Sequence, residues 1–247
     1  MTRFSRGALL GIFLLIFLQT GCKSQEYKRW FLEQSRTGSS NCVVGYAIPS
    51  YYPSSSAESA LQNASLHYAR NRFTIFEGGQ AFWSTSAGKI WMGNNFTETF
   101  DSTMVFKAME ILQPVDSMRT DRLVAFLFAP VSMELDGSLK EMVSVKKKPL
   151  PKWVTKTPEK KGYYYATGVA QESYYEPSAW MEAERMARKN LAGNIGITIE
   201  SLGKENWESQ EIQNQEISVE LQGIEVAARW KDDETNFYHV LIRMPKM

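Results

Sequence analysis

Serine and lysine side chains spaced one helical turn apart are the first candidates for chemistry in this chain. On a helix, a Ser-x-x-Lys pair places a nucleophilic hydroxyl beside an amine that can take its proton. The pattern occurs three times, beginning at Ser86, Ser144 and Ser201. None of these serines stands at a clear helix start, and the partner motifs that complete such sites are missing. We therefore predict no catalytic residue among them.

The two histidines do not form a second site. His67 is expected beside the apolar stripe of a helix, and His239 within an alternating strand, so they belong to different parts of the chain. Metal centres and acid–base centres need several such groups together. The spacing motifs of zinc proteases, nucleotide-binding loops and serine hydrolases are also absent. The sequence thus predicts no enzyme, no metal site and no cofactor.

Cys22 has the best-defined chemical fate, because it ends an export signal. The positive residues Arg3 and Arg6 precede an apolar run of 11 residues, Ala8 to Leu18, and small residues follow. A helix needs about 20 apolar residues to span a bilayer. Residues 1–21 are therefore predicted to be a cleaved signal peptide.

The segment Leu18-Gln19-Thr20-Gly21-Cys22 resembles the lipobox of bacterial lipoproteins, in which the cysteine becomes the acylated first residue. The resemblance implies a membrane anchor through acyl chains on Cys22. Gln19 departs from the apolar residue expected at its position. The alternative is an ordinary secretory signal that leaves Cys22 free to pair with Cys42. Lys23, where an aspartate would signal inner-membrane retention, favours the outer membrane, facing the periplasm.

Composition describes a folded protein without a strong electrostatic preference. The chain has 28 Lys plus Arg against 27 Asp plus Glu, and 43% of its residues are apolar. Balanced charge gives no field that would recruit nucleic acid, and none is expected as a partner. If Cys22 is acylated, Cys42 has no intramolecular partner, and we expect it to pack as a small apolar residue at a strand start.

An internal repeat organises the rest of the chain. Shifting the sequence by 123 positions aligns Gly45 with Gly168 and gives 10 identities in 31 ungapped positions, where chance gives about two. Each copy has an apolar strand, a Ser-Tyr-Tyr loop and a helix with an alanine-rich apolar stripe. We predict a duplicated α+β domain, each copy with a helix packed on an antiparallel sheet.

The tails of both copies predict β-hairpins. In the first, Val105–Val115 is expected as a strand that pairs with Leu123–Ala129. In the second, the alternation from Ile217 to Trp230 changes phase at Gly223, as a bulge within one strand would allow. Phe237–Met244 is expected to return as the last strand.

These elements divide the chain into five predicted parts. They are the signal peptide 1–21, a lipidated tether 22–41, a first α+β repeat 42–130, a linker 131–149 and a second repeat 150–247. The linker and the start of the second repeat are rich in lysine. This region is either a solvated connection or a contact for anionic lipid headgroups.

Aromatic pairs are the best candidates for an interaction surface. Tyr51-Tyr52 and Tyr174-Tyr175 stand before the helix of each copy, and Trp83 and Trp91 lie in a glycine-rich insertion of the first. Exposed tyrosine and tryptophan are frequent interface anchors. The alternative is that these rings cover the sheet end within their own domain.

The C-terminal copy resembles the LPP-twenty family of bacterial outer-membrane lipoproteins, whose domain also occurs in flagellar accessory lipoproteins. The matching segments are Pro151–Val154, Tyr165–Ala170, Ala183–Ala192 and Tyr238–Arg243. The resemblance covers about 100 residues and is weaker in the first copy. It implies an envelope location and a non-enzymatic role in assembly, and the family carries over no catalytic residues.

Together these features predict a lipid-anchored envelope protein. We expect a binding or scaffold role in an outer-membrane or flagellar-type assembly, with an envelope protein or a second copy as partner. The alternative is a periplasmic receptor for a small ligand or glycan, held at an aromatic-lined junction of the two repeats.

Overall fold

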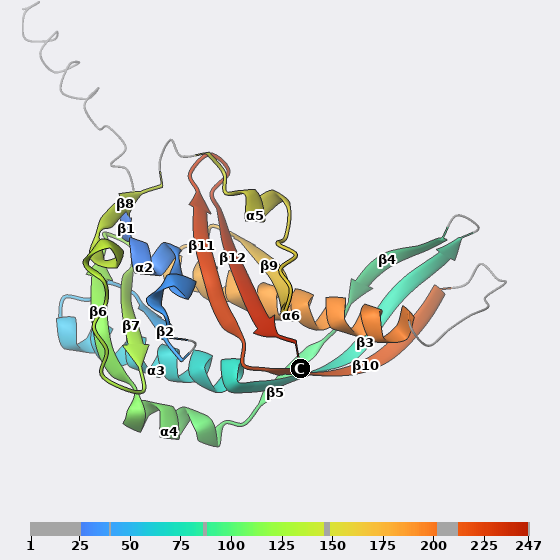
Figure 1. The fold of residues 1–247 in the computed structure, drawn as a ribbon, viewed down its shortest axis with the longest axis horizontal. Helices are drawn as coiled ribbons and strands as arrows, with labels where there is room; N and C mark the ends of the chain where they lie inside the picture. The colour runs from blue at the N-terminus through green and yellow to red at the C-terminus, as the bar shows by residue number, and fades with distance from the viewer. Residues whose placement is uncertain (1–25, 40, 86–87, 146–148, 202–211, 247) are drawn as a thin grey trace, which may run out of the picture.

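The structure, a computed structural model, is a mixed α+β fold with several antiparallel sheets (Figure 1). It describes residues 26–39, 41–85, 88–145, 149–201 and 212–246. The side chains of residues 80–94 and 197–217 are outside the description. The predicted signal peptide and Cys22 also lie outside the described residues.

The first unit of the fold is a helix packed on a three-stranded sheet. Strand β2 (Val43–Ala47) leads into helix α3 (Pro53–Arg72), and strands β6 (Gln113–Arg119) and β7 (Val124–Ala129) complete the sheet in the order β2-β7-β6. Proline suits the first position of α3, because its missing N–H has no partner there. The middle strand of this sheet, β7, is the last of the three in chain order.

The second unit repeats this arrangement. Strand β9 (Tyr163–Gln171) leads into helix α6 (Glu176–Ser201), and strands β11 (Glu225–Asp232) and β12 (Phe237–Pro245) follow. The sheet order is β11-β12-β9, so the last strand again lies in the middle. All its pairs are antiparallel.

One glycine in the first strand of each unit lets the helix backbone come close. A Cβ atom on Gly45 would lie 1.9 Å from the Ala60 carbonyl oxygen. A Cβ atom on Gly168 would lie 2.0 Å from the Ala183 carbonyl oxygen. Gly168 lies 123 positions after Gly45, and Ala183 lies 123 positions after Ala60. The glycine–alanine contact therefore occurs at residues that the sequence shift aligns.

A third sheet joins segments from both units into an arm (Figure 1). It contains β3 (Phe73–Thr85), β4 (Gly88–Asn94), β5 (Thr97–Phe100) and β10 (Ile212–Gln222). Strand β10 pairs with β3 along its whole length. The bulge predicted at Gly223 is therefore wrong: Gly223 has a φ of 66°, and the chain passes there from the arm to β11.

The strand predicted over Val105–Val115 is also wrong. Helix α4 (Thr103–Ile111) occupies most of it, packs against α3, and buries Ala108. Its apolar residues recur at spacings of three and four, which fit a helix as well as they fit a short apolar strand. The β-hairpin begins only at β6.

The N-terminal segment after residue 25 belongs to the core, although the sequence suggested a tether there. Strand β1 (Glu26–Lys28) pairs with β8 (Met142–Ser144), and helix α2 (Arg29–Leu32) and the 3-10 turn η1 (Gln34–Thr37) follow it. Tyr27, Trp30 and Phe31 have no exposed surface. We call residues 26–37 the N-terminal strap.

The expected linker is likewise partly in the core. Leu135, Leu139 and Val145 are buried in the same hydrophobic cluster as the strap and both units. A 3-10 turn, η2 (Gly137–Lys140), lies in this segment, and a short helix, α5 (Lys152–Thr155), follows it at the start of the predicted second repeat. One continuous apolar core thus includes the strap, the linker and the two sheets.

Candidate functional site

A pocket of about 430 Å³ lies where the first turns of α3 and α6 meet. Its apolar lining comes from Ala47 at the end of β2, from Ile48 just after it, and from Pro177 and Met181 of α6. Five serines add hydroxyl groups. They are Ser50, Ser55, Ser56, Ser59 and Ser178. The pocket therefore stands at the junction of the two units, and the hydroxyls on its wall outnumber its aromatic rings.

Helix geometry brings the hydroxyls of α3 to one wall. Ser55, Ser59 and Asn63 recur every four residues, so they lie on one face of α3. Two serines are used by the fold: the Ser56 hydroxyl accepts from Ser50 N at 3.0 Å and donates to the Ile48 carbonyl at 3.1 Å. Within the described part of the chain, the hydroxyls of Ser55, Ser59 and Ser178 have no protein hydrogen-bond partner, and Ser55 and Ser59 are open to solvent.

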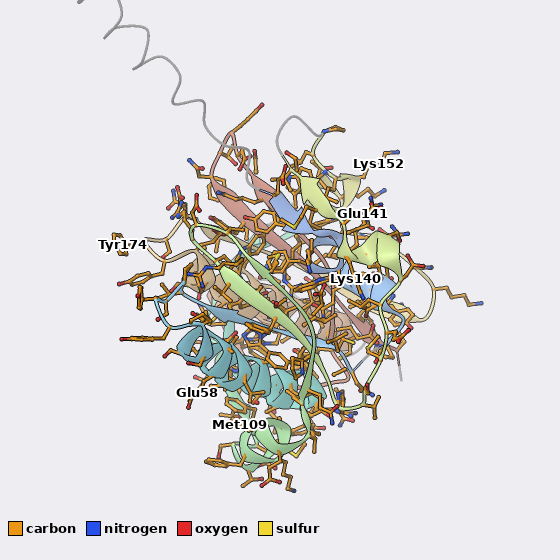
Figure 2. All side chains as sticks on the ribbon, turned by 90° about the vertical axis from the view of Figure 1, so that its left-hand side faces the viewer. Glu58, Met109, Lys140, Glu141, Lys152 and Tyr174 are labelled. Carbon is orange, nitrogen blue, oxygen red and sulfur yellow. The ribbon has the colours of Figure 1, made fainter. Side chains whose placement is uncertain are left out.

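The two tyrosine pairs precede the helices that form this pocket. Tyr51 and Tyr52 are 90% and 65% exposed, and Tyr174 and Tyr175 are 87% and 47% exposed. Each pair is edge-to-face, with ring centroids 5.2 Å and 4.8 Å apart. Figure 2 shows Tyr174 projecting outward from the surface of the molecule. The rings therefore stand in solvent instead of covering the sheet end.

Arginines of the β6–β7 hairpin hold the two tyrosine loops. Arg119 donates to the Ser50 carbonyl at 3.0 Å. Arg122 donates to the Glu172 carboxylate and, at 3.2 Å, to the Ser173 carbonyl. One hairpin thus contacts the loops of both units, which keeps them at the same end of the molecule.

The other two predicted interface residues are elsewhere. Trp83 lies on β3 and Trp91 on β4, and their side chains are outside the described residues. These strands begin after the C-terminal end of α3, and a helix of 20 residues spans about 30 Å. The structure therefore places both tyrosine loops against the β6–β7 hairpin and puts the two tryptophans on strands of the arm.

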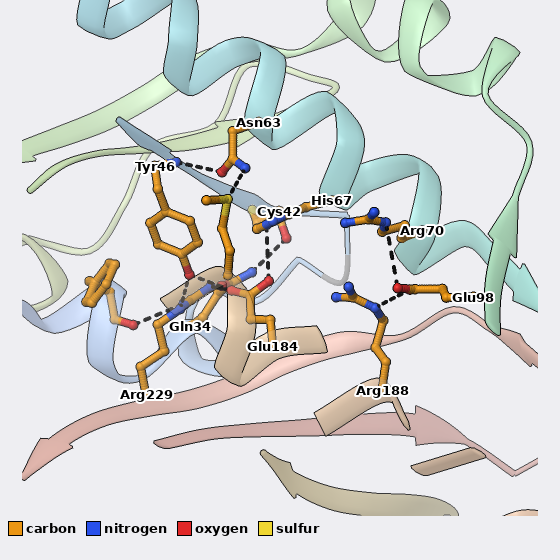
Figure 3. A network of polar contacts seen from close by, with 12 residues as sticks. Gln34, Cys42, Tyr46, Asn63, His67, Arg70, Glu98, Glu184, Arg188 and Arg229 are labelled. Atoms are coloured by element: carbon orange, nitrogen blue, oxygen red, sulfur yellow. Dashed lines mark hydrogen bonds and ion pairs between the residues drawn. The ribbon is translucent and has the colours of Figure 1, made fainter. Parts of the chain in front are cut away.

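A buried polar network lies below the pocket (Figure 3). Tyr46 lines the pocket with its ring, and its hydroxyl contacts the Glu184 carboxylate at 2.5 Å and the Arg229 Nε at 2.6 Å. Arg229 also donates to Glu184 at 2.8 Å and to Gln34 at 2.7 Å. The network therefore joins the strap, β2, α6 and β11.

His67 of α3 faces this ion pair. Its Nδ1 lies 3.1 Å from the second Glu184 oxygen, although the geometry is not that of a hydrogen bond. Burial lowers the pKa of His67 to about 4, against the attraction of Glu184. Burial alone would raise the pKa of Glu184, but His67, Arg229 and the Tyr46 hydroxyl outweigh it and lower this pKa to about 2. At neutral pH the imidazole is neutral, so Arg229 is the cation that balances Glu184.

A second charged group continues the contact between α3 and α6. Arg188 of α6 donates to Glu98 of β5 at 2.7 Å, and Arg70 of α3 lies 3.9 Å from the other Glu98 oxygen. Arg188 is almost completely buried. Ionic groups thus lie between the two helices, and Arg188 is the most deeply buried of this second group.

The remaining candidates for chemistry stay apart. His67 and His239 are both buried, on different elements. In each Ser-x-x-Lys pair at least one member, Ser86, Lys147 or Lys204, is outside the described residues. The described residues hold no group of three or more potential metal ligands. Cys42 is buried at the start of β2, as expected, and burial raises the pKa of its thiol.

Sequence reasoning suggested an aromatic-lined site at the junction of the two repeats, but it missed the serines that line the pocket and the ion pair below it. Ser55 and Ser178 match under the repeat shift, yet nothing in the sequence indicated that their side chains line one pocket. Glu184 is 45 residues from Arg229, so their pairing depends on the tertiary fold. The only signal was a charged residue directly beside the buried stripe residue Ala183.

The comparisons with known proteins give no relative. No family model matches the sequence, no curated protein is similar to it, and no solved structure matches the fold. Within the described residues, every helix is too short or too polar to cross a membrane.

Proposed function

We propose that this chain is a lipid-anchored envelope protein with a non-enzymatic binding or scaffold role in an outer-membrane or flagellar-type assembly. One observation carries the proposal: four exposed tyrosines, two from each unit, lie on loops that the same β6–β7 hairpin contacts. Tyrosine buries a large area on binding and loses little conformational entropy. This tyrosine end is the surface to which we assign an envelope protein partner or a second copy.

The anchor is Cys22, acylated after removal of residues 1–21. Only three residues lie between Cys22 and Glu26, the start of β1. The four steps from Cys22 to Glu26 span at most about 14 Å. Because the strap is part of the core, acyl chains on Cys22 would hold the folded body directly beside the membrane surface, facing the periplasm.

Gene duplication accounts for the two units. The shared strand order and the matching glycine–alanine contacts agree with the repeat in the sequence. The resemblance of the second copy to LPP-twenty lipoproteins supports the same envelope role. A duplicated domain also explains why both tyrosine pairs precede a helix.

The anchor is tested by fractionation. Cys22→Ser should move the protein from the membrane fraction to the soluble periplasm, because an acyl chain needs the thiol. The control Cys42→Ser keeps Cys22 and should stay with membranes. If the Cys22→Ser protein still partitions wholly with membranes, acylation is not the anchor.

The tyrosine end is tested by affinity capture from solubilised envelopes. Tyr51→Ser with Tyr174→Ser should lose the captured partner, because both rings are almost fully exposed and contribute to no core. Phe106→Ser is the matched control, since Phe106 is an aromatic residue 71% exposed on α4. Equal capture by both variants would reject the tyrosine end as the docking surface.

The pocket favours a second candidate function, a periplasmic receptor for a small ligand or glycan. It stands at the junction of the two units, where the sequence suggested such a site. Its volume falls in the range of about 300–1,000 Å³ that is usual for ligand pockets.

A further inference from the structure

We propose that the junction pocket binds an uncharged sugar, held by Ser55, Ser59 and Ser178 and flanked by the exposed tyrosines. This inference rests on the second candidate function and names its ligand class. The pocket volume of about 430 Å³ accommodates a pyranose ring with its substituents.

Hydroxyl groups without protein partners converge on the pocket from two sides. Ser55 and Ser59 come from α3, and Ser178 comes from α6. Each hydroxyl can donate one hydrogen bond and accept two. The Ser56 hydroxyl accepts from the Ser50 backbone N–H and donates to the Ile48 carbonyl, so it shapes the wall and leaves Ser55, Ser59 and Ser178 available.

The charge around the pocket favours a neutral ligand. Tyr46 is the one ionisable side chain in its lining, and the Tyr46 hydroxyl is already bonded to Glu184 and Arg229 below. Burial raises the pKa of Tyr46 well above its usual value, so this side chain stays neutral. The guanidinium groups of Arg119 and Arg122, which hold the tyrosine loops, are bonded to the loop carbonyls and to Glu172.

Apolar surface completes the chemistry of sugar recognition. Ile48, Pro177 and Met181 line the pocket beside the serines, and the tyrosine pairs stand at the helix starts just before Ser55 and Ser178. A pyranose presents hydroxyls at its edge and C–H groups on its faces. Hydroxyls therefore meet serines, and C–H faces meet aromatic or aliphatic side chains.

Matching positions of the two units contribute matching groups. Ser55 corresponds to Ser178 under the shift of 123 residues, and both follow a tyrosine pair by three positions. Their backbone N–H groups make matching bonds, from Ser55 to the Tyr52 carbonyl and from Ser178 to the Tyr175 carbonyl, each at 3.1 Å. The site is complete only when both units are present.

The experiment is calorimetric titration of the purified full chain, in detergent, with two uncharged trisaccharides, cellotriose and chitotriose. We expect saturable binding of at least one of them. Ser55→Ala with Ser178→Ala should weaken the binding about twentyfold, because each lost hydrogen bond weakens it several-fold. Ser54→Ala is the matched control and should leave it unchanged, since Ser54 is an exposed neighbour outside the pocket lining.

Three results would overturn the inference. They are no binding of either trisaccharide at millimolar concentration, equal binding by the double variant and the wild type, and binding of inorganic phosphate that Ser55→Ala with Ser178→Ala abolishes. Circular dichroism of the double variant verifies that it is folded. Neither fractionation of Cys22→Ser nor capture through the tyrosine end involves sugar. A failure of the sugar titration would therefore leave the proposed anchor and docking surface unaffected.

Discussion

Arg229 and Glu184 are a buried ion pair that the surrounding groups must compensate. Burying two charges costs several kcal/mol each, and attraction between them offsets this only when the remaining hydrogen bonds are also made. Arg229 satisfies this condition by donating to Tyr46, Gln34 and the Phe31 carbonyl. Removing one partner leaves an uncompensated charge, which costs about 3–5 kcal/mol. The pair therefore fixes how the strap meets the two units.

The neutral His67 makes stability depend on pH. Its pKa is about 4 in the folded protein, and an unfolded histidine titrates near 6.5. Between these values the unfolded chain binds more protons, so the free energy of unfolding falls as pH drops from about 6.5 to about 4. The expected loss is on the order of 3 kcal/mol. Urea unfolding at several pH values across this window measures it.

His67→Gln should flatten that dependence, because it removes the titrating group. The matched control is His239→Gln. Burial also lowers the pKa of His239, but Asp232 opposes this and the shift is smaller. A wild-type protein with constant stability from pH 7 to 4, or His67→Gln with an unchanged slope, would contradict the neutral buried imidazole.

At the scale of elements, each strand–helix contact depends on a glycine. Gly168→Ala should destabilise the protein by about 3 kcal/mol or more, because its Cβ would lie 2.0 Å from the Ala183 carbonyl oxygen and 2.2 Å from Ala187 N. Gly45→Ala should act similarly. Gly137→Ala is the control, since no atom lies within 4 Å of its added Cβ. Thermal unfolding compares the three, and equal melting temperatures for Gly168→Ala and Gly137→Ala would refute the close contact.

The local elements of each unit are the part of the fold that the sequence predicts. Strand, Ser-Tyr-Tyr loop and alanine-striped helix follow from periodicity, and the buried Ala60, Ala64, Ala183 and Ala187 agree with it. Helix α4 was mistaken for a strand because a short apolar run fits both periods. The sequence predicts β10 as part of the C-terminal hairpin, but β10 pairs with β3 instead. Alternating apolar residues indicate which face of a strand is buried, but they do not identify the strand with which it pairs.

The candidate site likewise has parts that the sequence predicts and parts that it does not. The position of each tyrosine pair before a helix was predictable, because it is local information, but the exposure of the rings was left open. A site at the junction of the repeats was suggested, but its serine lining was not, since that depends on how α3 lies against α6. The strap was missed for a related reason: its three core aromatics lie among polar residues, and four helical residues are too few to show a period.

At the scale of the whole molecule, the two units share one core. The Trp180 ring of α6 packs against Phe31 at 5.2 Å and Tyr27 at 5.9 Å, both from the strap. The Tyr27 hydroxyl donates to the buried Glu176 carboxylate at 2.6 Å. On the other side, Trp30 donates to Asp116 of β6 at 2.9 Å. The strap therefore lies between the units and is bonded to both.

Residues 150–247 are consequently predicted not to fold alone, although they contain a complete second unit. They would expose Trp180 and leave Arg229 without Tyr46, Gln34 and the Phe31 carbonyl. Glu184 would lose its contact with the Tyr46 hydroxyl. We expect poor amide dispersion in their NMR spectrum, and recovery of a dispersed spectrum when residues 26–145 are co-expressed. The full chain should unfold in one transition, with circular dichroism and tryptophan fluorescence coincident. A dispersed spectrum from residues 150–247 alone, or two separate transitions in the full chain, would mean that the units are independent domains and that the strap is an accessory to only one of them.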